Sequence, residues 1–184
     1  MPVNTLEEME AEVAAYCEAK GWNVNPVPFE AAMALLHEEA AEAGRAWRDW
    51  GLADHTIGVT AESPEGHWRA RPEGVGSEFA DILIRLLDDD ARFGLGLISV
   101  FRAYKGLYAV HGHFLANVNA LHVLIARASE CYAAGDGSHT EALAAVWAYL
   151  MQLCNLYGVN LQFEYRRKMD YNHKREFRHG GRRA

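Results

Sequence analysis

The sequence predicts an all-α fold, a helical bundle, and three observations support this class. Apolar residues recur at helical spacing over long segments, capping residues precede several of these segments, and no stretch alternates convincingly as a strand would. The chain has 184 residues, and 50% of them are hydrophobic, which is enough to bury one substantial core. We therefore expect residues 1–184 to form a single domain.

Two helices are predicted in the first part of the chain. Thr5 and Glu8 have the spacing of a capping box, which opens a first helix that Gly21 should end. Pro28 suits the first turn of a second helix, which should last until about Trp50. The apolar stripe of the second helix consists of Ala32, Leu35, Leu36, Ala40, Ala43 and Trp47.

A long connection and a third helix are predicted next. Helical periodicity disappears over residues 51–76, where Gly, Pro, Ser and charged residues dominate. A connection of that length is uncommon inside a compact domain, so we expect it to be functional or mobile. Ser77 can cap a third helix that should end near residues 88–90. Its core stripe is Phe79, Ile82, Leu83 and Leu86.

Three further helices are expected in the second half of the chain. Long apolar segments predict helices at about 97–134, with a break near Gly112, and at 141–157. Ser138 and Glu141 repeat the capping-box spacing before the second of these. A final helix should then begin after its capping residue. The capping residue and the basic and amide side chains assigned to this helix are Asn160, Arg166, Arg167, Lys168, Asn172 and Arg175.

Charge and cysteine content limit the possible partners and compartment. The net charge of -7 argues against a nucleic-acid binder, although residues 166–184 hold eight Lys or Arg against two acids. Cys17, Cys131 and Cys154 are odd in number and lack a CxxC spacing, which indicates neither disulfides nor a zinc ribbon. Without a signal peptide or an apolar run of about 18 residues, we expect no membrane association and a cytoplasmic location.

Two acidic clusters place carboxylates one helical turn apart. Glu38, Glu39 and Glu42 belong to the second predicted helix, and Glu78 and Asp81 belong to the third. Like charges at these spacings repel, and Mg²⁺, which prefers oxygen ligands, would compensate them. Acidic helix faces are common without a metal, so either cluster alone is more readily explained as structural. Carboxylates on two consecutive helices that lie antiparallel can, however, converge on one point.

These clusters resemble the signature of the MazG-like, all-α nucleoside triphosphate pyrophosphohydrolases, which is EExxE on one helix and ExxD on the next. The end of the chain is similar too. Residues 168–175 read KMDYNHKR and residues 178–181 read RHGG, like the KMxYNxxR and RHGG endings of several members, including phage-type ones. The resemblance implies a helical bundle of that family's type. It also implies hydrolysis of an NTP or dNTP between the α- and β-phosphates, giving the monophosphate and pyrophosphate.

The resemblance also implies a cofactor and roles for the acidic residues. Mg²⁺ would be required, with Mn²⁺ as a possible substitute, and Glu39, Glu42, Glu78 and Asp81 would be its ligands. Glu38 would be a further ligand or would orient or deprotonate the attacking water, which makes Glu38 and Glu39 the candidate catalytic residues.

The basic end of the chain would bind the substrate. By the same resemblance, Lys168 and Arg175 would hold the phosphates, and Tyr171 and Asn172 would orient the nucleotide. Members of this family commonly form dimers or tetramers, so a homo-oligomer is expected.

Other candidate residues carry a weaker signal. His37, beside the acidic motif, and Trp47 are candidates for substrate contact. A core or interface position explains Trp47 better, however, and a position beside the core suits His37 at least as well. His111, His113 and His122 lack a cysteine pair or a carboxylate at ligand spacing, so a zinc site is not favoured.

Some segments depart from the family pattern. Residues 51–76 and 91–157 are longer than the corresponding parts of most members, so we expect two insertions, followed by a basic tail at 176–184. Two alternatives to a general NTP pyrophosphohydrolase stay open. One is a specialised dUTP or dCTP pyrophosphatase, and the other is a non-catalytic, metal-binding helical scaffold.

Overall fold

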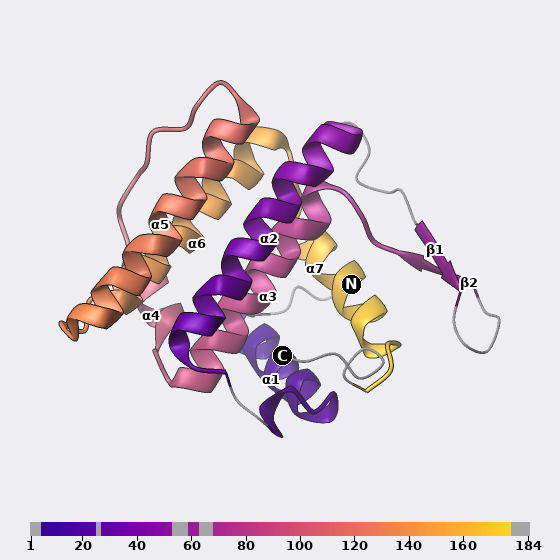
Figure 1. The fold of residues 1–184 in the computed structure, drawn as a ribbon, viewed down its shortest axis with the longest axis horizontal. Helices are drawn as coiled ribbons and strands as arrows, with labels where there is room; N and C mark the ends of the chain where they lie inside the picture. The colour runs from indigo at the N-terminus through magenta and orange to yellow at the C-terminus, as the bar shows by residue number, and fades with distance from the viewer. Residues whose placement is uncertain (1–4, 25–26, 53–58, 63–67, 178–184) are drawn as a thin grey trace.

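The protein folds as an all-α helical bundle, as its sequence predicts (Figure 1). The computed structural model describes residues 5–24, 27–52, 59–62 and 68–177. In chain order, the elements within these ranges are α1 (Leu6–Ala19), the 3-10 turn η1 (Trp22–Val24), α2 (Phe29–Trp50), β1 (Val59–Glu62), β2 (Trp68–Arg71), α3 (Val75–Phe93), α4 (Leu97–Ala103), α5 (Phe114–Ala134), α6 (His139–Tyr157) and α7 (Leu161–His173).

Helix α3 lies at the centre of the bundle and packs against α1, α2, α6 and α7. Its predicted core stripe is buried, with Phe79, Ile82 and Leu86 at 0% exposure and Leu83 at 3%. Helix α2 runs antiparallel to α3 and packs against α5 on its other side (Figure 1). The two helices that carry the acidic clusters are therefore neighbours.

Two of the predicted helix caps are confirmed. The Thr5 hydroxyl accepts a hydrogen bond from the Glu8 amide, and the Glu8 carboxylate accepts one from the Thr5 amide, which completes the capping box of α1. The Asn160 side chain accepts a hydrogen bond from the Phe163 amide at the start of α7. Pro28 is the N-cap of α2 and lies one residue before the first turn.

The prediction that Ser77 caps the third helix is wrong. Helix α3 begins at Val75 with Gly74 as its N-cap, where φ is 102°, a conformation that favours glycine. Ser77 is buried in the first turn, and its hydroxyl donates to the Pro72 carbonyl at 3.1 Å and accepts from Lys168 Nζ at 2.9 Å. Ser77 therefore holds Lys168, one of the predicted substrate residues, instead of capping the helix.

The second predicted capping box is also wrong. Ser138 is the N-cap of α6, but its side chain makes no capping hydrogen bond. The hydroxyl donates instead to Asp136 Oδ1 at 2.7 Å, within the turn between α5 and α6. A local hydrogen bond to the turn has replaced the bond to the helix.

Helix α3 continues beyond residues 88–90, where the sequence predicts its end. It runs to Phe93 and stops at Gly94, which adopts a left-handed conformation. Asp90 accepts hydrogen bonds from the amides of Leu97 and Ile98 at 2.8 and 3.1 Å, so it satisfies the first turn of α4. Asp90, the last of the three aspartates at 88–90, thus joins α3 to α4.

The connection between α2 and α3 contains a short two-stranded ribbon that the sequence analysis does not predict. Strands β1 and β2 pair antiparallel, with Val59 opposite Arg71 and Glu62 opposite Trp68. The remainder of the predicted insertion, at 53–58 and 63–67, lies outside the described residues. The ribbon ends at Arg71, which borders the candidate site.

The predicted single break near Gly112 is a longer interruption, because α4 ends at Ala103 and α5 begins at Phe114. Asn117, which is fully buried, holds the end of this connection. Its amide group donates to the His111 carbonyl at 2.9 Å and accepts from the His111 amide at 2.7 Å. The Tyr149 hydroxyl of α6 donates to the same side chain at 2.8 Å.

Helices α6 and α7 meet at Gly158 with a bend of 106°. None of the described helices is, by itself, long and apolar enough to cross a membrane, and α6 with α7 meet the length and composition criteria only as a bent pair. Lys20, after α1, donates from Nζ to the carbonyls of His173 and Arg175, so the end of α7 is held against the end of α1.

Candidate acidic site

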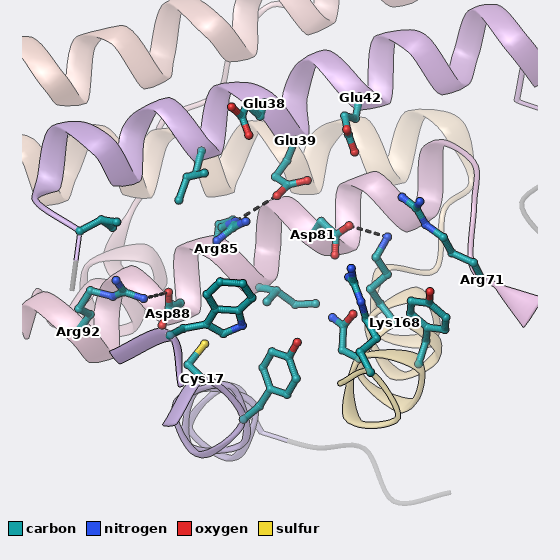
Figure 2. Close-up of a pocket in the computed structure, with 18 residues that line it drawn as sticks. Cys17, Glu38, Glu39, Glu42, Arg71, Asp81, Arg85, Asp88, Arg92 and Lys168 are labelled. Atoms are coloured by element: carbon teal, nitrogen blue, oxygen red, sulfur yellow. Dashed lines mark hydrogen bonds and ion pairs between the residues drawn. The ribbon is translucent and has the colours of Figure 1, made fainter. Parts of the chain in front are cut away.

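Three of the predicted metal ligands meet where α2 crosses α3. Glu39, Glu78 and Asp81 each have a carboxylate oxygen within 4.8 Å of an oxygen of the other two, and we call them the acidic triad. Glu78 and Asp81 are one turn apart on α3, and Glu39 reaches them from α2 (Figure 2 shows Glu39 and Asp81). The helical spacing therefore places all three on one spot.

Burial makes the charge of this triad unfavourable without a cation. Glu78 is 3% exposed, and its Oε2 is buried with no hydrogen-bond partner among the described residues. Burial raises the pKa of Glu78 to about 8, with Lys168 opposing the shift and neighbouring carboxylates adding to it. Burial and the charge of Asp81 raise the pKa of Glu39 to about 7, against the effect of Arg85.

Lys168 brings a buried positive charge from α7 to the triad. It is 4% exposed, and its Nζ lies 2.5 Å from Asp81 Oδ2 while also donating to the Ser77 hydroxyl. Burial alone would lower the pKa of Lys168, but Asp81 and Glu78 raise it overall. The lysine is therefore held as an ammonium at the edge of the triad.

Arg85 is a second cation at the triad, and it was not among the residues predicted from the sequence. It lies one turn after Asp81 on α3, and its Nε donates to Glu39 Oε1 at 3.1 Å (Figure 2). The carboxylate of Asp81 also helps to raise the pKa of Arg85. Its spacing of four residues from a predicted ligand was the available signal.

The other two glutamates of the first cluster line the same pocket but lie outside the triad. Glu42 is half-buried, and its Oε1 lies 3.5 Å from Arg45 Nη2. Glu38 is exposed at the pocket wall. The structure thus brings together three of the four predicted ligands. The fourth, Glu42, lies one helical turn after Glu38 and Glu39 on α2 and is not part of the triad.

The predicted substrate residues after Lys168 also line the pocket. Tyr171 and Asn172 come from the last turn of α7, and Asn172 Oδ1 is buried without a hydrogen-bond partner among the described residues. Arg175 follows the helix instead of belonging to it, with its guanidinium 5.7 Å from the Tyr171 ring centroid. The similar segment at 178–181 lies outside the described residues.

His37 and Trp47 do not line the pocket. His37 Nδ1 lies 2.8 Å from Nδ1 of His122 on α5, so it faces the opposite side of α2. The Trp47 ring packs against Phe114 of α5 with centroids 5.5 Å apart. Their positions favour the alternative stated for them, which is packing beside the core, and give no support to contact with a substrate.

The pocket has a volume of about 340 Å³ and extends from the triad along α3. Asp81, Arg85, Asp88 and Arg92 line it at intervals of four, three and four residues, and so form one polar face (Figure 2). Arg92 Nη2 donates to Asp88 Oδ2 at 2.6 Å at the far end. The rest of the lining, which the sequence does not point to, consists of Tyr16, Cys17, Trp22, Val27, Leu35 and Ile84.

Comparison with known proteins adds no identification. No family model matches this chain, and no curated protein or solved structure shows a significant match to it.

Proposed function

We propose that the protein is a Mg²⁺-dependent nucleoside triphosphate pyrophosphohydrolase, which converts an NTP or dNTP and water into the monophosphate and pyrophosphate. The observation that carries this proposal is the acidic triad with its unpartnered, buried Glu78 oxygen. Carboxylate oxygens are the ligands that Mg²⁺ prefers, and an unpaired buried carboxylate is strongly unfavourable without a cation. The residues present thus fit a divalent metal.

In this proposal, Glu39, Glu78 and Asp81 hold the metal, and Glu42 is the next carboxylate within the pocket. A bound Mg²⁺ supplies charge neutralisation for the phosphates and a point of orientation for them. Exposed Glu38 accepts a proton from the attacking water. Because the reaction develops negative charge on phosphate oxygens, positive groups beside the triad favour its transition state.

Two parts of the pocket suit two parts of a nucleotide. Lys168 and Arg71 lie beside the triad and Arg175 lies near Tyr171, and these basic groups would bind the polyphosphate. The aromatic and aliphatic part of the lining, which includes Trp22, would receive the nucleoside. A pocket of about 340 Å³ is within the range for small-molecule sites.

A panel assay tests the proposal. Pyrophosphate release and the nucleotide product are measured for canonical and modified NTPs and dNTPs, with Mg²⁺, with Mn²⁺ and with a chelator. Metal-dependent formation of monophosphate and pyrophosphate is expected, and a strong preference for dUTP or dCTP would identify a specialised enzyme. Absence of turnover with every nucleotide would contradict the proposal and favour a non-catalytic scaffold.

A further inference from the structure

Arg85 and Lys168 neutralise the acidic triad from within the protein, but in different ways. Lys168 is 4% exposed and binds both Asp81 and Ser77. The side chain of Arg85 is 36% exposed on the pocket wall. Its only hydrogen bond to a described residue is the one from Nε to Glu39. Because Arg85 is more exposed than Lys168 and has fewer partners, it is the cation that can be displaced from the triad.

Any metal that binds Glu39 competes with this ion pair. The side chain of Glu39 is 14% exposed, so its carboxylate charge is poorly solvated and is favourable only beside a cation. Arg85 supplies that cation at one oxygen of Glu39, and a divalent ion at the triad would bring two further positive charges beside the guanidinium. The metal and Arg85 would therefore repel each other and compete for the same carboxylate.

We infer that Arg85 is an exchangeable partner of Glu39: it neutralises this carboxylate in the metal-free protein and donates to the polyphosphate of the substrate once a metal takes Glu39. The second half of this inference rests on the proposed function. The guanidinium has five N–H donors in a planar fork that matches phosphate oxygens. Arg85 lies between Asp81 and Asp88 on the polar face of α3 and lines the pocket, so a polyphosphate bound there would be within its reach.

This exchange would couple metal and substrate binding. Metal alone must displace Arg85 from Glu39, whereas metal together with a polyphosphate gives the displaced guanidinium a new anionic partner. Each ligand would then strengthen the binding of the other. In the metal-free, substrate-free protein the ion pair would keep Glu39 from being buried as a lone charge.

Mn²⁺ binding to the nucleotide-free protein tests whether Arg85 and a metal compete for Glu39. Electron paramagnetic resonance or calorimetry measures this binding. Arg85→Met should bind Mn²⁺ about tenfold more tightly than the unmodified protein, because a charge-assisted hydrogen bond no longer competes. Arg102→Met is the control: Arg102 is an exposed arginine on α4 that pairs with Glu7, and neither residue lines the pocket. Its Mn²⁺ affinity should not change.

If Arg85 donates to the polyphosphate, Arg85→Met should raise the KM for the nucleotide about tenfold, because a phosphate contact is lost. Arg85→Lys, a milder change that keeps the charge, should show smaller shifts in both quantities, and circular dichroism reports whether each variant folds. Unchanged or weaker Mn²⁺ binding in both variants would overturn the inference. If the unmodified protein hydrolyses no nucleotide, the proposed function fails, while the Mn²⁺ comparison still decides the exchange.

Discussion

Lys168 Nζ lies 2.5 Å from Asp81 Oδ2, and this ion pair connects α7 to α3 at the acidic triad. The two side chains are 5% and 17% exposed, so the pair is mostly shielded from water. The same ammonium donates to Ser77 in the first turn of α3. The helix that brings the basic residues and the helix that brings two of the acids are thus joined at the point where we place the chemistry.

Lys168→Met should weaken both folding and catalysis. Removing the ammonium leaves Asp81 without its buried partner, which should lower the free energy of unfolding by about 3 kcal/mol. Losing a positive group beside the phosphates should reduce kcat by roughly 10²-fold or more. Urea unfolding and pyrophosphate release measure the two effects. Lys105→Met, at an exposed position outside the pocket, is the control and should behave like the unmodified protein.

Glu78→Gln should separate stability from function. The amide has nearly the shape of the carboxylate but carries no charge, so at pH 8 the metal-free protein should gain about 1–2 kcal/mol of stability. The same change should abolish stabilisation by Mg²⁺ and any pyrophosphate release. Thermal unfolding with and without Mg²⁺ tests this, with exposed Glu30→Gln as the control. A destabilised variant that still responds to Mg²⁺ would contradict the assignment of Glu78.

Ionisation of Glu39 and Glu78 should destabilise the metal-free protein progressively as the pH rises from about 4.5 to 8. The pKa values of Glu39 and Glu78 are raised from 4.5 to about 7 and about 8, so in this window the folded state holds more protons than the unfolded state. Stability is then lost as the pH rises through the folded pKa values. Protons and Mg²⁺ compete for the same oxygens, so added Mg²⁺ should raise Tm more at pH 8 than at pH 6.

Melting curves at both pH values, with excess Mg²⁺ and with a chelator, measure this difference. In Glu78→Gln, added Mg²⁺ should leave Tm unchanged at both pH values, because the variant lacks one of the metal ligands. An Mg²⁺ shift in Tm that is equal at both pH values would show that the metal does not bind where the carboxylates titrate.

The all-α class could be predicted from the sequence because its signals are local. The stripe of α3 and the caps at Thr5 and Asn160 depend on residues within one or two turns, and the structure confirms them. The β1–β2 ribbon depends on pairing between separate segments, which no local period reveals. Asn117, which hydrogen-bonds the connection before α5, likewise accepts a hydrogen bond from Tyr149, which is distant in sequence.

The acidic triad could be predicted for the same reason, since two of its members are three residues apart on one helix. Arg85, Asp88 and Arg92 were missed because charges on an amphipathic helix usually face solvent, and only the packing of α1 and α7 encloses them. His37 is close to Glu39 in sequence. Two residues correspond to about 200° of rotation around a helix, however, which turns His37 toward α5.

The contact between His37 and His122 should make the α2–α5 interface sensitive to acid. Burial lowers the pKa of both rings, and the neighbouring ring adds to the effect on His37. One Nδ1 must donate and the other accept across their 2.8 Å separation, so protonation of both rings would remove the acceptor. Because both folded pKa values lie below the unfolded value of 6.5, this contribution to stability is present above pH 6.5 and is lost as the pH falls.

His122→Asn tests this contact, because it removes one titrating ring and leaves an amide oxygen that can still accept from His37. At pH 7.5 the substitution should lower the free energy of unfolding by about 1 kcal/mol, because the stacking of the two rings, whose centroids lie 5.1 Å apart, is lost. At pH 5.5 the difference from the unmodified protein should shrink, since the unmodified pair has itself been weakened. His111→Asn, at an exposed side chain, serves as the control. A difference that grows toward pH 5.5 would mean that the pair is more stable when protonated.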